Sequence, residues 1–414
     1  MTDLTAVHTT WWEAYAADRA LRAGEAVGPL DDAWLAVAAR LHAQVVGIDD
    51  QEAPATAHDA IDDAAVRALH RAIDTLATTP STATAAAVAD AARRVADDLD
   101  RAGAFHLAGV LLRDAQALCA AHGANASDGS LLWQRARAAR QAGQLDAAAD
   151  GYAAAAEAAR RVCDSDTELR ALLGTGNLAH MRGNYPAARA GYREALRRAA
   201  AAGTVGDIHA CAAHQGLALA AVAARDLDAA LAHGWAAYVA SGDADDEAHA
   251  LLNVAEACRL AGDWSAALRA ALAVVERASV ARLRMPALGT AADAAARLGR
   301  DALLRALRGR VDALGAAAGP YEHAHTLLEF AEAWALRRVR PQADDDAHAA
   351  LAIGERHGFH EIVVRADTVI AALADDRADA PSRVAPAATA RWSRAARAAL
   401  HGVHALPDTT LAHA

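Results

Sequence analysis

Apolar and polar positions recur along most of the chain with the period of an amphipathic helix. In the segment LLGTGNLAHMR before Gly183, and in YPAARAGYREALRRA after it, apolar or small residues return every three or four positions. Residues three and four apart share one face of an α-helix, so each segment predicts a helix with one buried face. The glycine between them predicts a short turn, and the two segments together predict a pair of helices.

The same turn recurs. The sequence motif of the turn begins with a glycine and any one residue, followed by an aromatic residue or leucine. Any two residues and then an alanine complete it. Successive copies start 40, 40, 42, 37 and 37 residues apart. A glycine permits the backbone conformation of a helix end, and an Asp or Asn after it caps the next helix. The copies begin at Gly103, Gly143, Gly183, Arg225 (a degenerate copy), Gly262 and Gly299 (a weaker one).

Small residues stand seven positions before four of these turns, where two helix backbones would approach closely. They are Ala136, Gly176, Ala218 and Ala255. A single pair of helices cannot bury its shared face, so we expect the pairs to stack into an array.

This pattern resembles the tetratricopeptide repeat (TPR) family, over residues of about 84 to 374. The resemblance implies an all-α, right-handed superhelical solenoid of helix pairs. The units here are longer than the ~34 residues usual for the family, so we expect extended helices or turns.

The rest of the chain is expected to flank the solenoid. Residues 1–80 predict an N-terminal cap of three helices at Leu4–Ala23, Leu30–Val46 and Ala60–Thr78. Residues 81–374 form the solenoid, with about six to seven helix pairs. Residues 375–388 are a linker by composition, and 389–414 predict an amphipathic helix and a polar tail. Trp392, Ala396, Ala399 and Leu400 form the stripe of that helix, which we expect to cover the last repeat or to bind a partner.

Composition supports helices and excludes several functions. Hydrophobic residues make up 54% of the chain, mostly alanine, and aromatic residues only 4%, which suits thin seams between helices better than a thick β-sheet core. The net charge of −11 excludes a basic nucleic-acid surface. No apolar run predicts a membrane span and no signal pattern begins the chain, so we expect a cytoplasmic protein.

The four cysteines do not form a metal-binding pattern. Cys119, Cys163, Cys211 and Cys258 lie 44 to 48 residues apart, with no CxxC motif or Cys/His cluster. We expect four small buried thiols and no metal.

The TPR resemblance also places a binding site. In that family the first helix of each pair lines the concave face, so exposed positions before each turn become candidates. Asparagine can hold the backbone of an extended peptide, and arginine pairs with a carboxylate. The expected partner is therefore a protein or peptide that carries acidic groups or a free C-terminal carboxylate. The candidates are Trp133, Arg137, Arg140, Arg170, Asn177, His180, Gln215, His249, Asn253, Glu256 and Arg259.

Three functions remain open at this point. The first is a non-enzymatic adaptor or regulator that binds a peptide in the concave groove. The second follows from a similarity in layout to the Rap-type bacterial peptide-sensing regulators, and is a signalling-peptide sensor whose N-terminal bundle binds a partner protein. The third is an enzyme with a pocket in the solenoid, although no catalytic motif supports it and no cofactor is expected.

Overall fold

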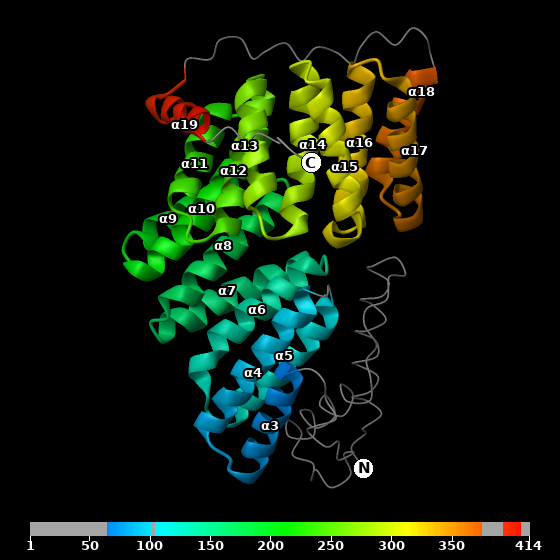
Figure 1. Ribbon diagram of the computed structural model, residues 1–414. Helices are drawn as coiled ribbons and strands as arrows, with labels where there is room; N and C mark the ends of the chain where they lie inside the picture. The colour runs from blue at the N-terminus through cyan, green and yellow to red at the C-terminus, as the bar shows by residue number, and fades with distance from the viewer. Residues whose placement is uncertain (1–63, 102–103, 375–391, 407–414) are drawn as a thin grey trace. The chain divides into compact units, whose positions relative to one another are not determined.

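The computed structural model describes residues 64–101, 104–374 and 392–406 (Figure 1). Their regular structure consists of α-helices and one 3-10 turn, and no strand occurs among them. The predicted all-α class is therefore confirmed. The first two helices of the predicted cap, the turn at Gly103 and the predicted linker lie outside the described residues, and the boundaries at 80 and 374 remain predictions.

The chain divides into two compact units between Gly183 and Asn184. The described helices of the first unit begin with the third helix of the predicted cap. They are α3 (Ala64–Thr78), α4 (Thr82–Arg101), α5 (Phe105–Ala121), the 3-10 turn η3 (Asn125–Ser127), α6 (Asp128–Gln141), α7 (Leu145–Arg161) and α8 (Ser165–Met181).

The second unit contains the remaining helices. They are α9 (Tyr185–Ala199), α10 (Thr204–Ala223), α11 (Leu227–Val239), α12 (Ala244–Ala261), α13 (Trp264–Arg277), α14 (Ala281–Arg297), α15 (Asp301–Ala318), α16 (Pro320–Leu336), α17 (Arg340–His357), α18 (His360–Ala374) and α19 (Arg394–Ala405).

Within each unit the helices pack as a repeat array. From α3 to α8 and from α9 to α18, each helix contacts the next one along the chain, and the first helices of neighbouring pairs also contact each other. In the first unit those first helices are α4, α6 and α8; in the second they are α10, α12, α14 and α16, with α18 following in the same row. The chain is thus a helical-repeat protein by its own packing.

The predicted turns have the expected backbone. The turn glycines within the described residues have positive φ angles, as at Gly143 (77°) and Gly262 (79°), and Arg225 adopts the same conformation with φ of 57°. After the turn, the side chains of Asn184, Asp226 and Asp263 each accept a hydrogen bond from a backbone N–H in the first turn of the next helix. The positive-φ turns and the side-chain N-caps that follow them are therefore confirmed.

Neighbouring pairs are joined by a tyrosine that lies against a glycine. Tyr152 of α7 is buried against Gly174 of α8, where an added Cβ would lie 2.3 Å from the ring. Tyr192 of α9 lies against Gly216 of α10 in the same way, with 2.4 Å for the corresponding distance. Only a residue without a side chain leaves room for the ring at these two points.

A buried polar joint connects three helices near the end of the second unit. Arg308 of α15 donates from Nε to Asp346 of α17 over 2.7 Å, and Trp334 of α16 donates from Nε1 to the other carboxylate oxygen over 3.1 Å. Asp346 is only 4% exposed, so these bonds replace the water that its carboxylate loses.

Two expectations need correction. Cys119, Cys211 and Cys258 are buried as expected, but Cys163 is exposed. It occupies a turn after α7 with φ of 56°, a position that carries its side chain into solvent. The C-terminal helix forms as expected, but α19 does not cover the last repeat. It packs on α11 and α13, and its N-terminus is fixed where the Ser393 N–H donates to Asp228 over 2.6 Å.

The tyrosine–glycine joint gives a first prediction. Gly174→Ala should lower the free energy of unfolding, because overpacking costs about 1–3 kcal/mol and outweighs the gain of about 1 kcal/mol in helix propensity. Gly309→Ala in α15 is the matched control, since nothing lies within 4 Å of an added Cβ there. It should stabilise the chain by a few tenths to about 1 kcal/mol. Thermal and urea unfolding of both variants measure the difference, and equal shifts in the two would contradict the joint.

Candidate functional site

The structure brings together three of the predicted binding residues in the first unit. Trp133 of α6 is half-buried, and two guanidinium groups lie over its ring, those of Arg137 at 5.9 Å and Arg170 at 5.0 Å from the ring centroid. Arg170 comes from α8, so the cluster spans two neighbouring first helices. Cation–π contacts of this kind hold the arginine side chains in place over the ring.

The arginines of this cluster already pair with acids of the chain. Arg137 forms ion pairs with Asp100 at 2.5 Å and with Asp97 at 3.6 Å, both on α4. Arg170 pairs with Asp166 at 2.8 Å on its own helix. An acidic peptide would have to compete with these internal carboxylates, so the ion pairs disfavour its binding. Ligand binding at this cluster stays a prediction.

The other predicted residues of the first unit lie toward the ends of α6 and α8. Arg140 donates from Nε to the hydroxyl of Tyr152 over 3.3 Å and so is attached to the joint between repeats. Asn177 is exposed on α8, and His180 is half-buried on the same helix, where burial lowers its pKa. Asn177 is the member of this group that the solvent reaches most freely.

The predicted residues of the second unit belong to a separate set. His249 is exposed and Asn253 is half-buried, both on α12. Arg259 donates to both carboxylate oxygens of Glu256, over 2.6 and 2.7 Å, and lies 3.5 Å from Asp293 of α14. Gln215 of α10 donates to the backbone oxygen of Asp246 over 3.4 Å. Here too the arginine is already held by carboxylates, and these ion pairs raise its pKa.

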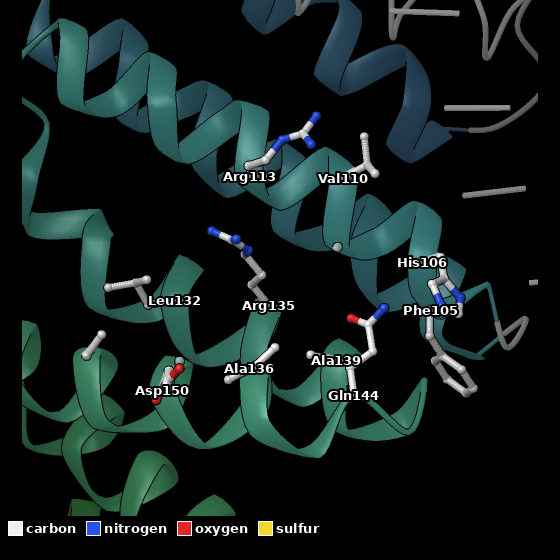
Figure 2. A pocket seen from close by; sticks show the side chains of 14 residues that line it. Phe105, His106, Val110, Arg113, Leu132, Arg135, Ala136, Ala139, Gln144 and Asp150 are labelled. Carbon is white, nitrogen blue, oxygen red and sulfur yellow. The ribbon is translucent and has the colours of Figure 1, made fainter. Parts of the chain in front are cut away.

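A pocket that the sequence interpretation missed opens on another face of the first unit. Its volume is about 760 Å³, and α5, α6 and α7 form its walls (Figure 2). On α6, the pocket residues are offset from Trp133 and Arg137 by roughly a third of a helical turn, because each residue advances the helix by about 100°. The pocket is lined by Phe105, His106, Gly109, Val110, Arg113, Leu132, Arg135, Ala136, Ala139, Gln144, Ala147, Asp150, Gly151 and Ala154.

The pocket combines small residues with two arginines. Gly109 and four alanines leave the space open, while Gly151 packs against Ala136. Arg113 and Arg135 bring positive charge from two of the walls (Figure 2). Arg113 pairs with the buried Asp114 at 2.9 Å. Arg135 is exposed, and its Nη1 donates to the amide oxygen of Gln116 over 3.4 Å. Arg135, whose hydrogen bond is to an uncharged amide, is therefore the cation that an entering carboxylate would meet, and Asp150 lines the same pocket with the opposite charge.

The second unit contains an equivalent groove that is filled. Counted from the first residue of each helix, His106 and Arg113 of α5 match Asp228 and Trp235 of α11. In the other wall, Gln144 and Asp150 match Asp263 and Arg269 of α13. All four matching residues contact α19 or the residue at one of its ends, Ser393 or Leu406. The groove that is open between α5 and α7 thus holds a helix between α11 and α13.

These contacts show how α19 is held. Gly402 lies so close to Trp235 that an added Cβ would be 2.1 Å from the ring. His404 lies 3.6 Å from Asp263, and Arg269 donates to the backbone oxygen of Leu406 over 2.9 Å. The buried face of α19 carries Ala396, Ala399, Val403 and Leu406, and the half-buried Trp392 precedes it.

The floors of the two grooves differ. Counted back from the turn glycines, Leu132, Arg135, Ala136 and Ala139 of α6 match Leu251, Val254, Ala255 and Cys258 of α12. The four residues of α12 are fully buried, whereas Arg135 is exposed. An alignment of the two units on their turn glycines shows this replacement of valine by arginine, and it is the sequence signal that could have found the pocket.

Two histidines form a separate polar contact in the second unit. The Nδ1 atoms of His214 on α10 and His233 on α11 lie 3.1 Å apart, and both rings are half-buried. Burial, then His214, Arg193 and Arg189, lower the pKa of His233 to about 4, although Asp226 acts in the opposite direction. Burial also lowers the pKa of His214. The neutral pair is thus the form that the folded chain stabilises.

Neither a metal centre nor a membrane span emerges from the described ranges. No three histidine, cysteine, aspartate or glutamate side chains within 64–101, 104–374 and 392–406 are placed to hold a metal ion together. Over the same ranges, no helix combines the length and the apolar character needed to cross a bilayer.

Comparison with known proteins leaves the family open. No protein-family model matches the chain, and no curated protein matches it. Among solved structures, the chain is similar to the crystal structure of BtubC (BKLC) from P. vanneervenii, with 18% identity, a TM-score of 0.44 and coverage of 52% of this chain and 88% of that one. It is also similar to a circular tandem repeat protein with novel repeat topology and enhanced subunit contact surfaces, with 13% identity, a TM-score of 0.21 and coverage of 89% and 87%. Both similarities are too low to carry a conclusion, so the helical-repeat assignment depends on the packing of the chain itself.

The histidine pair predicts a pH dependence of stability. The pKa of His233 is about 4 in the folded chain against about 6.5 when unfolded, so the unfolded chain takes up the proton first as the pH falls. Stability should therefore decline between pH 6.5 and 4. His233→Asn should flatten that part of the profile, and His348→Asn, at an exposed histidine of α17, is the control for the loss of one imidazole. Urea unfolding at a series of pH values measures this, and parallel profiles for the three proteins would contradict it.

Proposed function

We propose that the chain is a non-enzymatic protein-binding adaptor or regulator, and that its binding site in the first unit is the open groove between α5 and α7. The observation that supports this most directly is α19, which occupies the register-equivalent groove between α11 and α13. One surface of this repeat type thus binds a helix within the chain, and the same surface is open in the other unit.

The groove indicates the chemistry of its ligand. The small residues of the pocket walls suit one apolar face of a helix, as α19 demonstrates in the second unit. Arg135 stands where α12 has the buried Val254, and Arg113 where α11 has Trp235. A ligand of this groove should therefore be an amphipathic helix with carboxylates beside its apolar stripe. An acidic protein segment was also the expectation from the sequence, but in extended form and on the concave face.

The finer features of the fold belong to the same proposal. Three features of the turns support a TPR-type repeat with a right-handed superhelix. They are the glycine, the side chain after it that caps the next helix, and the large residue two positions after the glycine. The peptide-binding role of Asn177 and Asn253 and the N-terminal cap are proposals that follow from that type. A cytoplasmic location is likewise proposed.

A blocked groove tests the function. The probe is a fluorescein-labelled 20-residue peptide with Trp, Ala, Leu, Val and Leu at positions i, i+4, i+7, i+11 and i+14. Its aspartates are at i+9 and i+10, because Gly402, at i+10 in α19, lies against Trp235, the residue that matches Arg113. Gly109→Trp should weaken its binding at least tenfold, because nothing lies within 4 Å of an added Cβ at this pocket residue and the indole fills the groove. Gly309→Trp, at an equally open glycine outside the pocket, is the control. Fluorescence anisotropy measures both, and equal affinity in the two variants would contradict the site.

Charge reversal tests the ligand chemistry. Arg135→Glu should weaken the acidic probe about tenfold and strengthen a probe in which arginines replace the aspartates, since the floor of the pocket then carries the opposite charge. Arg305→Glu, at an exposed position of α15, should change neither. The preference should shrink as salt rises from 50 to 500 mM, because screening weakens exposed charge pairs. A variant that ranks the two probes as the parent chain does would contradict the role of Arg135.

A further inference from the structure

The pocket between α5 and α7 contains one cation and one anion that are open to a ligand. Arg135 of α6 and Asp150 of α7 line it from different walls (Figure 2). Asp150 is exposed and has no hydrogen bond or ion pair to any residue that the structure describes. Within the same part of the chain, Arg135 makes one hydrogen bond, the long one of 3.4 Å to the uncharged amide of Gln116.

The other arginine of the pocket is already compensated. Arg113 donates from Nε and from Nη2 to one carboxylate oxygen of Asp114, over 3.0 and 2.9 Å. Asp114 is only 3% exposed, and breaking such a pair would leave its buried charge uncompensated. Arg135 is therefore the cation with which a ligand carboxylate pairs, and Asp150 is the anion for a ligand cation.

The helix in the second groove shows which part of a ligand would face Asp150. Counted from Trp392 as position i, the end of that helix at Leu406 is position i+14, and Arg269 donates to the backbone oxygen of Leu406 over 2.9 Å. Asp150 stands at the position that matches Arg269. It would thus face the last turn of a bound helix, whose free carbonyl groups repel a carboxylate and attract cations. A lysine or arginine in that turn offsets the repulsion and pairs with Asp150.

The acidic residue of such a ligand belongs on the other flank of its apolar stripe. Gly402, at i+10, lies against Trp235, the residue that matches Arg113. Arg135 extends from α6 toward Arg113 (Figure 2). His404, at i+12, lies 3.6 Å from the N-cap residue of α13. Because each residue turns the helix by about 100°, i+15 lies about 60° from i+12 and about 140° from i+10, so i+10 and i+15 face the two oppositely charged walls.

We propose that the groove between α5 and α7 selects a partner helix of mixed charge. The helix carries a carboxylate at i+10, which pairs with Arg135, and a lysine or arginine at i+15, which pairs with Asp150. This rests on the proposed function of the groove and specifies its ligand further. The two charges also set the direction of the helix, because a reversed helix carries its basic residue to the other end of the groove.

Two probes of identical composition test the order of the charges. Both are versions of the labelled 20-residue peptide with glutamine at i+9. The matched probe has aspartate at i+10 and arginine at i+15, and the swapped probe has these two residues exchanged. Fluorescence anisotropy should give at least tenfold tighter binding of the matched probe to the parent chain.

Variants of the protein separate the effect of the groove from that of the peptides. The helicity of each free probe is the same in every titration, so a change in the ratio of the two affinities reports on the protein alone. Asp150→Arg places there the residue type of α13 and should reduce that ratio at least fivefold, and the addition of Arg135→Glu should reverse it. Glu157→Arg is the matched control, since this exposed residue lies two turns further along α7 and outside the pocket. It should keep the ratio of the parent chain.

The outcomes distinguish this inference from the function on which it rests. If both probes bind the parent chain equally and Gly109→Trp blocks both, the groove binds a helix and the charge selection is overturned. If Asp150→Arg keeps the ratio of the parent chain, or Glu157→Arg changes it equally, the role of Asp150 is overturned. If neither probe binds, the proposed function fails and the inference fails with it.

Discussion

The structure depends on how closely the backbones of neighbouring helix pairs approach. At two repeats a buried tyrosine takes the space that a Cβ would need on the next helix, Tyr152 over Gly174 and Tyr192 over Gly216. An alanine-rich chain has few large side chains, so it gains contact by bringing backbones together rather than by filling a wide core. The first helices of successive pairs then pack against one another within each unit.

That packing leaves grooves over the second helices, and the two units use theirs differently. Between α11 and α13 the groove is filled by α19, which arrives from more than a hundred residues away in the sequence. Between α5 and α7 the matching positions surround a pocket of about 760 Å³ that contains Arg113 and Arg135. Because the two grooves share a register, the residues that contact α19 in one have counterparts that line the pocket in the other.

Much of this fold could be predicted from the sequence, because its rules are local. A glycine with positive φ followed by an Asx cap is a property of a few adjacent residues, and so is the face that Ala136 and Ala255 present to a neighbour. The candidate site was harder, because Arg137 and Arg259 meet acids from other helices, and single-helix patterns carry no information about those partners. The position of α19 depends on contacts between residues far apart in sequence, and Cys163 is exposed in a turn with positive φ, outside the helical pattern that predicts burial.

The tyrosine–glycine joint also limits how this chain can change in length. One residue inserted between Tyr152 and the end of α7, or before Gly174 in α8, would rotate one side of the joint by about 100°. The tyrosine ring would then clash with a side chain instead of packing on the glycine backbone, and the close contact between the two helices would be lost. Insertions at the exposed tips of the turns, or in helix ends beyond the joint, leave this contact unchanged. The first helices of successive repeats accordingly differ in length, from 14 residues in α6 to 20 in α10, while the tyrosine and the glycine keep their places at these two joints.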